Sequence, residues 1–180
     1  MAITYHDLYL KTRMALSSAG IEAAQLEARE ILCAAAEKTA EELYRDISLY
    51  TTDAIAEKTE ALQARRLAGE PIAYLLGEWS FCGLPFFVSP AALIPRVDTE
   101  MLAQLAMNRL KEHPGHTRIL DLCAGTGCVG LTAAALLKNT RAVLVDLSDG
   151  ALDLCKRNIR RHKLTGRAVS LKGDALQAPS

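Results

Sequence analysis

The feature that most constrains the fold of this chain is a strand, turn and helix pattern at residues 118–130, which reads Arg-Ile-Leu-Asp-Leu-Cys-Ala-Gly-Thr-Gly-Cys-Val-Gly. The apolar residues around Asp121 are typical of a short buried parallel strand. Gly125 and Gly127 predict a turn in which the backbone can approach a ligand with no Cβ in the way. The apolar residues that follow predict a helix whose N-terminus faces the turn. This pattern favours an α/β fold with a ligand at the turn.

Two kinds of cofactor fit this turn. Residues 125–130 match the G-x-G-x-x-G of dinucleotide-binding folds, and Asp146 lies near the distance expected for a ribose-binding acid. Asp121, however, would repel a pyrophosphate at the helix N-terminus. Its carboxylate favours S-adenosylmethionine, which carries an ammonium and a sulfonium group. We therefore expect S-adenosylmethionine here, with a dinucleotide, or a structural turn without a ligand, as the alternatives.

Two further strands are expected after this helix. Residues 142–146 are rich in β-formers and end at Asp146, whose carboxylate can accept hydrogen bonds from both hydroxyls of a ribose. Residues 168–171 predict another strand, which leads to Asp174. This aspartate could reach the adenine edge or could serve only as a turn residue. Ala175 beside it offers no aromatic face on which an adenine could stack.

The first 68 residues predict a small bundle of helices. Capping patterns place helix starts after Thr4 and Thr39 and near Thr52 or Asp53, and glycines end helices at Gly20 and Gly69. Each helix carries its apolar residues on one side, so the helices must pack together to bury them. Nothing in this part looks catalytic, and we expect either a partner-binding module or a stabilising extension.

A different pattern follows the helical part. Aromatic and apolar residues alternate around Cys-Gly-Leu-Pro at residues 82–85, which predicts a β-hairpin. A helix is then expected through about residue 110. Pro95 excludes an earlier start of that helix, and Asp98 or Thr99 could cap it. Arg96 and Glu100 could form an ordinary ion pair.

Composition narrows the classes of protein. The chain has 180 residues, half of them apolar and 23% charged, so it can bury a core. Residues 1–70 hold 8 lysines and arginines against 12 acidic residues, which suits a basic protein partner. The five cysteines form no C-x-x-C pair and no metal-ligand spacing, so we expect no metal and reduced thiols in the cytoplasm. No segment is apolar for long enough to predict a membrane helix.

Several segments of the chain closely resemble the HemK/PrmC family of peptide-chain release factor glutamine N5-methyltransferases. The segments that carry this resemblance are Glu70–Gly77, Phe81–Gly83, Phe86–Val88, Leu93–Glu100 and Asp121–Gly127. The most specific is Pro95–Glu100, although Val97 stands where the family commonly has proline. The resemblance implies methyl transfer from S-adenosylmethionine to the glutamine amide of the Gly-Gly-Gln loop in class 1 release factors.

The resemblance also implies a fold and a set of site residues. The fold is α/β, with a helical partner-binding domain at 1–69, a β-hairpin linker at 70–95 and a partial Rossmann-like domain at 96–180. Residues 123–127 would hold the methionine moiety, Asp146 the ribose, and Asp174 with Ala175 the adenine region. The full set of expected cofactor-binding residues is Asp121, Cys123, Ala124, Gly125, Thr126, Gly127, Asp146, Asp174 and Ala175. The expected substrate-side or structural signature is Pro95, Arg96, Thr99 and Glu100.

One departure concerns catalysis. The family's Asn-Pro-Pro-Tyr motif, which follows the fourth strand, does not occur in the 180 residues. We therefore expect a monomer that docks a release factor and binds cofactor without turnover, contacting neither nucleic acid nor a membrane. Two alternatives remain: an adenine-N6 methyltransferase acting on nucleic acid, and a release-factor-binding module whose cofactor fold has decayed. Salt-sensitive binding to DNA or RNA would favour the first.

Overall fold

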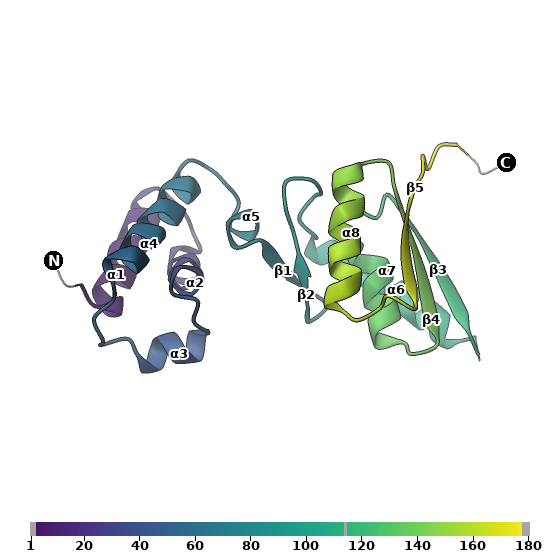
Figure 1. Cartoon of the computed structure of the whole chain (residues 1–180), viewed down its shortest axis with the longest axis horizontal. Helices are drawn as coiled ribbons and strands as arrows, with labels where there is room; N and C mark the ends of the chain where they lie inside the picture. Colours follow the sequence, from purple (N-terminus) through teal and green to yellow (C-terminus); the bar gives the residue numbers. More distant parts are fainter. Residues whose placement is uncertain (1–2, 114, 178–180) are drawn as a thin grey trace. The chain divides into compact units, whose positions relative to one another are not determined.

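The computed structural model describes residues 3–113 and 115–177 (Figure 1). The chain divides into two compact units, Met1–Leu76 and Gly77–Ser180. The functional division at residues 69 and 95 remains a prediction. Within the described residues, no helix is both long enough and apolar enough to cross a membrane.

The first unit is helical, as the sequence predicts. Its helices are α1 (Tyr5–Ser18), α2 (Ala24–Ala36), α3 (Ala40–Arg45), α4 (Asp53–Leu67) and α5 (Ile72–Leu76). The predicted caps are confirmed: the hydroxyls of Thr4, Thr39 and Thr52 each accept a hydrogen bond from an amide of the first helical turn. Sequence analysis missed α5, because a five-residue helix is too short to show a helical period.

The core of this first unit lies around α2. Ile31 and Leu32 of α2 are fully buried, together with Leu8 and Leu16 of α1. A largely buried ion pair joins α2 to α4, with Arg66 Nε 2.6 Å from the Glu27 carboxylate. These contacts hold the helices as one packed bundle.

The second unit opens with the predicted hairpin, formed by β1 (Glu78–Phe81) and β2 (Leu84–Phe87). Cys82 and Gly83 between the strands have φ of 49° and 73°, as expected of a two-residue hairpin turn with left-handed residues. Phe81 and Phe86 are buried and meet edge to face. The hairpin is therefore packed into the core of this unit.

Helix α6 (Val97–Lys111) corrects two expectations about its start. Its N-cap is Arg96, which makes no side-chain cap, so Asp98 and Thr99 lie inside the first turn and do not cap the helix. Glu100 does not pair with Arg96 either. Its carboxylate accepts a hydrogen bond of 2.7 Å from the backbone amide of Cys82 at the hairpin turn. The helix start is fixed by Pro95, which disfavours helical backbone just before it.

A parallel sheet completes the second unit. Strands β3 (Thr117–Leu122), β4 (Thr140–Asp146) and β5 (Ala168–Lys172) lie in the order β3-β4-β5. Helices α7 (Cys128–Leu136) and α8 (Asp149–Arg161) connect successive strands. This is the predicted first half of a Rossmann-like sheet.

The two faces of the sheet differ. Ala142 and Leu144 of β4 are buried with α7 and α8 in the hydrophobic core. On the opposite face, exposed apolar side chains occur on both outer strands: Leu120, Leu122, Val169 and Leu171. Parallel sheets normally have both faces covered.

Thr132 on α7 offers a test of the packing. Its side chain is fully buried, and its hydroxyl finds no hydrogen-bond partner among the described residues. Because an unpaired buried hydroxyl is costly, Thr132→Val is expected to raise the free energy of unfolding by about 1 kcal/mol. Urea unfolding followed by the fluorescence of Trp79, in the same unit, measures this. The matched control is Thr140→Val, which removes a hydroxyl paired with Thr117 at 2.8 Å. The control should lower stability, and a loss from Thr132→Val would contradict the prediction.

Candidate functional site

A cavity of about 510 Å³ lies where the carboxyl ends of the strands meet the segment before α6. Ligands of open α/β sheets bind at this edge. Most of the predicted site residues line the cavity: Pro95, Arg96, Thr99, Asp121, Cys123, Ala124, Gly125, Thr126 and Asp146. The structure thus brings together acids and a glycine turn that sequence analysis placed on separate elements.

The other predicted residues lie elsewhere. Gly127 is the N-cap of α7 and packs inward, and Glu100 binds the hairpin turn. Asp174 accepts a hydrogen bond from the backbone amide of Leu176, which forms a local turn after β5. Ala175 next to it is exposed. The adenine role of Asp174 and Ala175 therefore stays a prediction.

The glycines at the turn serve packing as well as conformation. Gly125 and Gly127 have φ of 55° and 77°, in the left-handed region that glycine adopts readily. A Cβ on Gly127 would lie 2.9 Å from Leu144 Cδ1, in the core and not toward the cavity. A Cβ on Gly130 would lie 2.6 Å from Leu144 Cδ2. Gly127 and Gly130 therefore allow α7 to pack closely against β4.

Cys123 adopts the same unusual backbone conformation as those glycines, with φ of 57°. The general methyltransferase pattern has a glycine at this position. A side chain in this conformation costs roughly 1–2 kcal/mol. The cysteine is exposed and lines the cavity. Cysteine in place of glycine at position 123 is therefore tolerated sterically but carries backbone strain.

Asp121 is a half-buried acid at the end of β3. Its Oδ2 accepts a hydrogen bond of 2.9 Å from the amide of Gly130 in the first turn of α7. Burial raises the pKa of the Asp121 carboxyl, the Gly130 amide opposes this, and the charge of Asp146 adds to the rise. A carboxylate in such a setting would be stabilised by a cationic ligand.

Asp146 is the last residue of β4, and its carboxylate binds backbone amides of the glycine turn and of the segment before α8. Its Oδ2 accepts from the amide of Gly125 at 2.8 Å, and its Oδ1 accepts from the amide of Ser148 at 2.9 Å. Ser148 in turn caps α8 by accepting a hydrogen bond from the amide of Ala151. Each oxygen of Asp146 keeps one acceptor position, so the carboxylate can still accept two further hydrogen bonds.

Two residues of α8 that sequence analysis did not assign to the site also hold the glycine turn. The thiol of Cys155 donates to the carbonyl of Gly125 at 3.3 Å. The side-chain amide of Asn158 donates to the carbonyl of Thr126 at 2.9 Å. Asn158 could have been noticed as a polar residue at helical spacing from Cys155 and Leu152, on the apolar side of α8.

The cavity fits S-adenosylmethionine better than a phosphate-bearing cofactor. Asp121 and Asp146 form no ion pair with a cationic side chain in the part of the chain that the structure describes. The two acids outnumber Arg96, the one cationic side chain among the residues that line the cavity, so the lining favours a positively charged ligand and opposes a pyrophosphate. The helix N-terminus of α7 can still receive the ligand's carboxylate. The donor set therefore suits a small zwitterion with an attached ribose.

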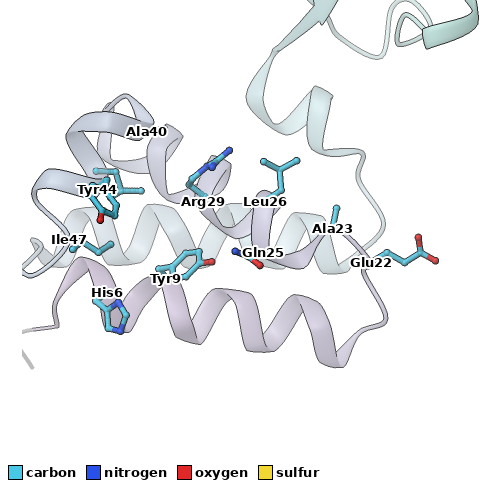
Figure 2. A pocket seen from close by; sticks show the side chains of 11 residues that line it. His6, Tyr9, Glu22, Ala23, Gln25, Leu26, Arg29, Ala40, Tyr44 and Ile47 are labelled. Carbon is cyan, nitrogen blue, oxygen red and sulfur yellow. The ribbon is translucent and has the colours of Figure 1, made fainter.

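A second cavity, of about 580 Å³, lies in the helical unit (Figure 2). Side chains from α1, α2 and α3 line it, among them Tyr9, Leu26, Arg29 and Tyr44. Tyr44 is 83% exposed and Leu26 51% exposed. This cavity contains neither the glycine turn nor a pair of acids, so it is not the cofactor site.

The parallel sheet, its crossover helices and the paired acids at the glycine turn define a class I S-adenosylmethionine-dependent methyltransferase domain. Comparisons with known proteins agree. Residues 7–77 match the PrmC N-terminal domain, and residues 96–179 match the methyltransferase small domain. The two domain matches confirm the resemblance to the HemK/PrmC family of release factor glutamine methyltransferases that the sequence motifs predicted. S-adenosylmethionine is the cofactor of this family.

Individual relatives carry the same name. The release factor glutamine methyltransferase of Nitratidesulfovibrio vulgaris is 35% identical over 176 residues, 95% of this chain and 57% of that protein. Its counterpart in Geobacter sulfurreducens is 36% identical over 168 residues, 93% of this chain and 57% of that protein. The Escherichia coli counterpart is 47% identical over 107 residues, 59% of this chain and 38% of that protein. The chain thus spans little more than half the length of the relatives it matches most fully.

Asp121 makes stability depend on pH. Because its pKa is higher in the folded than in the unfolded chain, folding is favoured at low pH, and this contribution is lost as pH rises through the folded-state pKa. Asp121→Asn removes the charge while its amide oxygen can still accept from Gly130. We expect the variant to melt above the wild type at about pH 7 and to lose this advantage near pH 4. Calorimetric melting at both pH values measures the difference. An equal gain in melting temperature at about pH 7 and near pH 4 would contradict the prediction.

Proposed function

We propose that this chain carries the cofactor-binding and partner-docking parts of a release factor glutamine N5-methyltransferase. Asp121 would attract the ammonium group of S-adenosylmethionine, Asp146 would accept from the ribose hydroxyls, and the first amides of α7 would receive the carboxylate. Asp174 and Ala175 would lie at the adenine. When bound, the cofactor supplies an electrophilic methyl group. The observation that carries the proposal is the pair of acids at the glycine turn, neither of which forms an ion pair in the described part of the chain.

The acceptor proposed for the methyl group is the side-chain amide of the glutamine in the Gly-Gly-Gln loop of a class 1 release factor. The names of the relatives support this choice. An amide nitrogen is a poor nucleophile, because its lone pair is delocalised. In the family, the Asn-Pro-Pro-Tyr motif positions this nitrogen, and the motif does not occur in these 180 residues. We therefore propose that the chain alone binds both cofactor and factor without methylating the factor.

The helical unit is the proposed docking module for the release factor. Its excess of acidic residues suits a basic protein surface, and the cavity lined by Tyr9, Leu26 and Tyr44 offers exposed apolar contacts. The proposed setting is the cytoplasm, with a monomeric chain that binds no nucleic acid directly.

Calorimetric titration with S-adenosylhomocysteine, beside NAD⁺ as a comparison ligand, tests the cofactor part of the proposal. We expect micromolar binding of S-adenosylhomocysteine and none of NAD⁺. Binding of NAD⁺ alone, or of neither ligand by a folded chain, would refute the assignment. Tight, salt-sensitive binding to DNA or RNA would instead favour a nucleic-acid methyltransferase.

Capture of a purified class 1 release factor on the immobilised chain tests the partner. We expect capture to require the helical unit, and failure to capture would refute the docking role. Capture that persists in the double variant Asp121→Ala, Asp146→Ala, with no cofactor binding by the wild type, would favour a pure binding module. A radiolabelled methyl transfer assay with the same factor completes the test, and product formed by this chain alone would refute the proposed lack of turnover.

A further inference from the structure

One fully buried side chain joins the hairpin to the glycine turn. Asn158 on α8 is 0% exposed. Its Nδ2 donates to the carbonyls of Thr126 at 2.9 Å and Phe87 at 3.0 Å, and its Oδ1 accepts from the amide of Phe87 at 2.8 Å. Both amide hydrogens and the amide oxygen are therefore used. The orientation of the carboxamide is fixed, because only the nitrogen can donate to the two carbonyls.

These contacts orient the peptide groups of the turn. In a planar trans peptide the C=O and the following N–H point in opposite directions. Cys155 holds the carbonyl of Gly125 and Asn158 holds the carbonyl of Thr126, so two successive carbonyls face α8. The amide of Thr126 is consequently directed away from α8. The helix thus determines how the turn presents its backbone.

The hairpin is held at both of its ends. At the turn, the amide of Cys82 binds Glu100 on α6. At the end of β2, the ring of Phe87 lies beneath two guanidinium groups, Arg157 at 4.6 Å and Arg161 at 4.3 Å. The chain then continues into residues 91–96, which form one wall of the cofactor cavity. Phe87 is therefore the point at which the hairpin meets both α8 and, through Asn158, the glycine turn.

We propose that Asn158 is a positioning residue for the cofactor site, which couples the seating of the hairpin on α8 to the shape of the glycine turn. The inference rests on the proposed cofactor site, since its consequence is a dependence of cofactor affinity on a side chain outside the cavity. Asn158 does not line that cavity. Its effect on a ligand must pass through Thr126, or through Phe87 and the segment that follows it.

The substitution Asn158→Asp tests the coupling by pH. As a neutral acid, the new side chain can accept from Phe87 and donate one hydrogen bond; as a carboxylate, it faces two carbonyl oxygens with no hydrogen to offer. Burial raises its pKa. We expect the variant to bind S-adenosylhomocysteine within about threefold of the wild type near pH 5.5 and at least about tenfold more weakly near pH 8. The wild type should not change in this way.

Other titrating and charged groups are common to both proteins, so the ratio of dissociation constants removes their contribution. On the elements around Asn158 they include Glu78, Asp121, Cys128, Asp146, Cys155, Arg157, Arg161 and His162. Thr132→Val, a buried change on α7 away from the turn, is the control and should leave the affinity unchanged. The inference would be overturned if the folded Asn158→Asp variant shows a dissociation constant that does not rise with pH relative to that of the wild type.

Amide hydrogen exchange gives a test that does not require the variant to fold. In the wild type, binding of S-adenosylhomocysteine should slow exchange at Phe87 as well as at Gly127, whose amide donates to the carbonyl of Ala124 within the glycine turn, although neither residue lines the cavity. Protection of Gly127 alone would overturn the coupling. If the wild type does not bind the ligand, the proposed function fails, and exchange in the ligand-free Asn158→Asp variant decides the inference. Loss of protection at both amides supports it, and loss at Phe87 alone refutes it.

Discussion

Replacement of Asp146 by alanine is expected to weaken binding of S-adenosylhomocysteine about 100-fold or more. The carboxylate would lose two hydrogen bonds to the ribose, each worth about 1.5–3 kcal/mol for a charged acceptor, and about 1.4 kcal/mol corresponds to tenfold in affinity. It would also release the amide of Gly125, which it holds at 2.8 Å. Isothermal titration calorimetry of the folded variant measures the effect.

A neighbouring acid provides the control for Asp146→Ala. Asp149 lies three residues later, at the start of α8, and pairs on the surface with Lys172. Asp149→Ala makes the same change of charge outside the cavity, and exposed ion pairs contribute little to stability. Its affinity should stay within about threefold of the wild type. Equal losses in the two variants would mean that net charge, and not the ribose contact, governs binding.

Replacement of Gly130 by alanine is expected to destabilise the second unit by about 2 kcal/mol or more. A helical Gly→Ala change ordinarily stabilises by up to about 1 kcal/mol, so the sign is informative. Here the new Cβ would lie 2.6 Å from Leu144 Cδ2 and 3.2 Å from both Cβ and Oδ2 of Asp121. The fully buried Leu144 has little room to move. Thermal unfolding should show a melting temperature lower by roughly 8–16 °C.

Gly166 supplies the matched control for Gly130. A Cβ there meets no atom within 4 Å, and its φ is not in the left-handed region. Gly166→Ala should be neutral or slightly stabilising, because it restricts the unfolded chain. If Gly130→Ala melts at or above the temperature of Gly166→Ala, α7 does not pack against β4 as closely as the structure indicates.

Local sequence patterns predicted most of the secondary structure of this chain. Threonines followed by acids marked the starts of α1 and α3, and the left-handed Cys-Gly pair marked the hairpin turn. Both signals act within a few residues, so they can be interpreted without tertiary contacts. The acids at the ends of β3 and β4 were predictable for the same reason, because parallel strands bring their carboxyl ends to one edge.

The contacts that sequence analysis missed join distant parts of the chain. Sequence analysis offered Arg96, four residues away, as a possible ion-pair partner of Glu100, because residues at this spacing are neighbours on a helix. Glu100 binds the amide of Cys82 instead, since the packed hairpin brings that group closer. Asn158 and Cys155 were assigned no role at the site, because their roles depend on which backbone carbonyls face α8. No local sequence pattern predicts a hydrogen bond between a side chain and a backbone group so distant in the chain.

The hydrogen bonds of Asn158 have a consequence for the order of folding. They span 71 residues to Phe87 and 32 residues to Thr126. Contacts at such separation require long loops to close first, and they form slowly for that reason. The glycine turn therefore cannot reach its final shape while it is still a local strand-turn-helix segment. The glycine turn reaches that shape only after α8 has docked and the hairpin has packed on it. The ability to bind ligand should therefore be among the last properties that the refolding chain recovers.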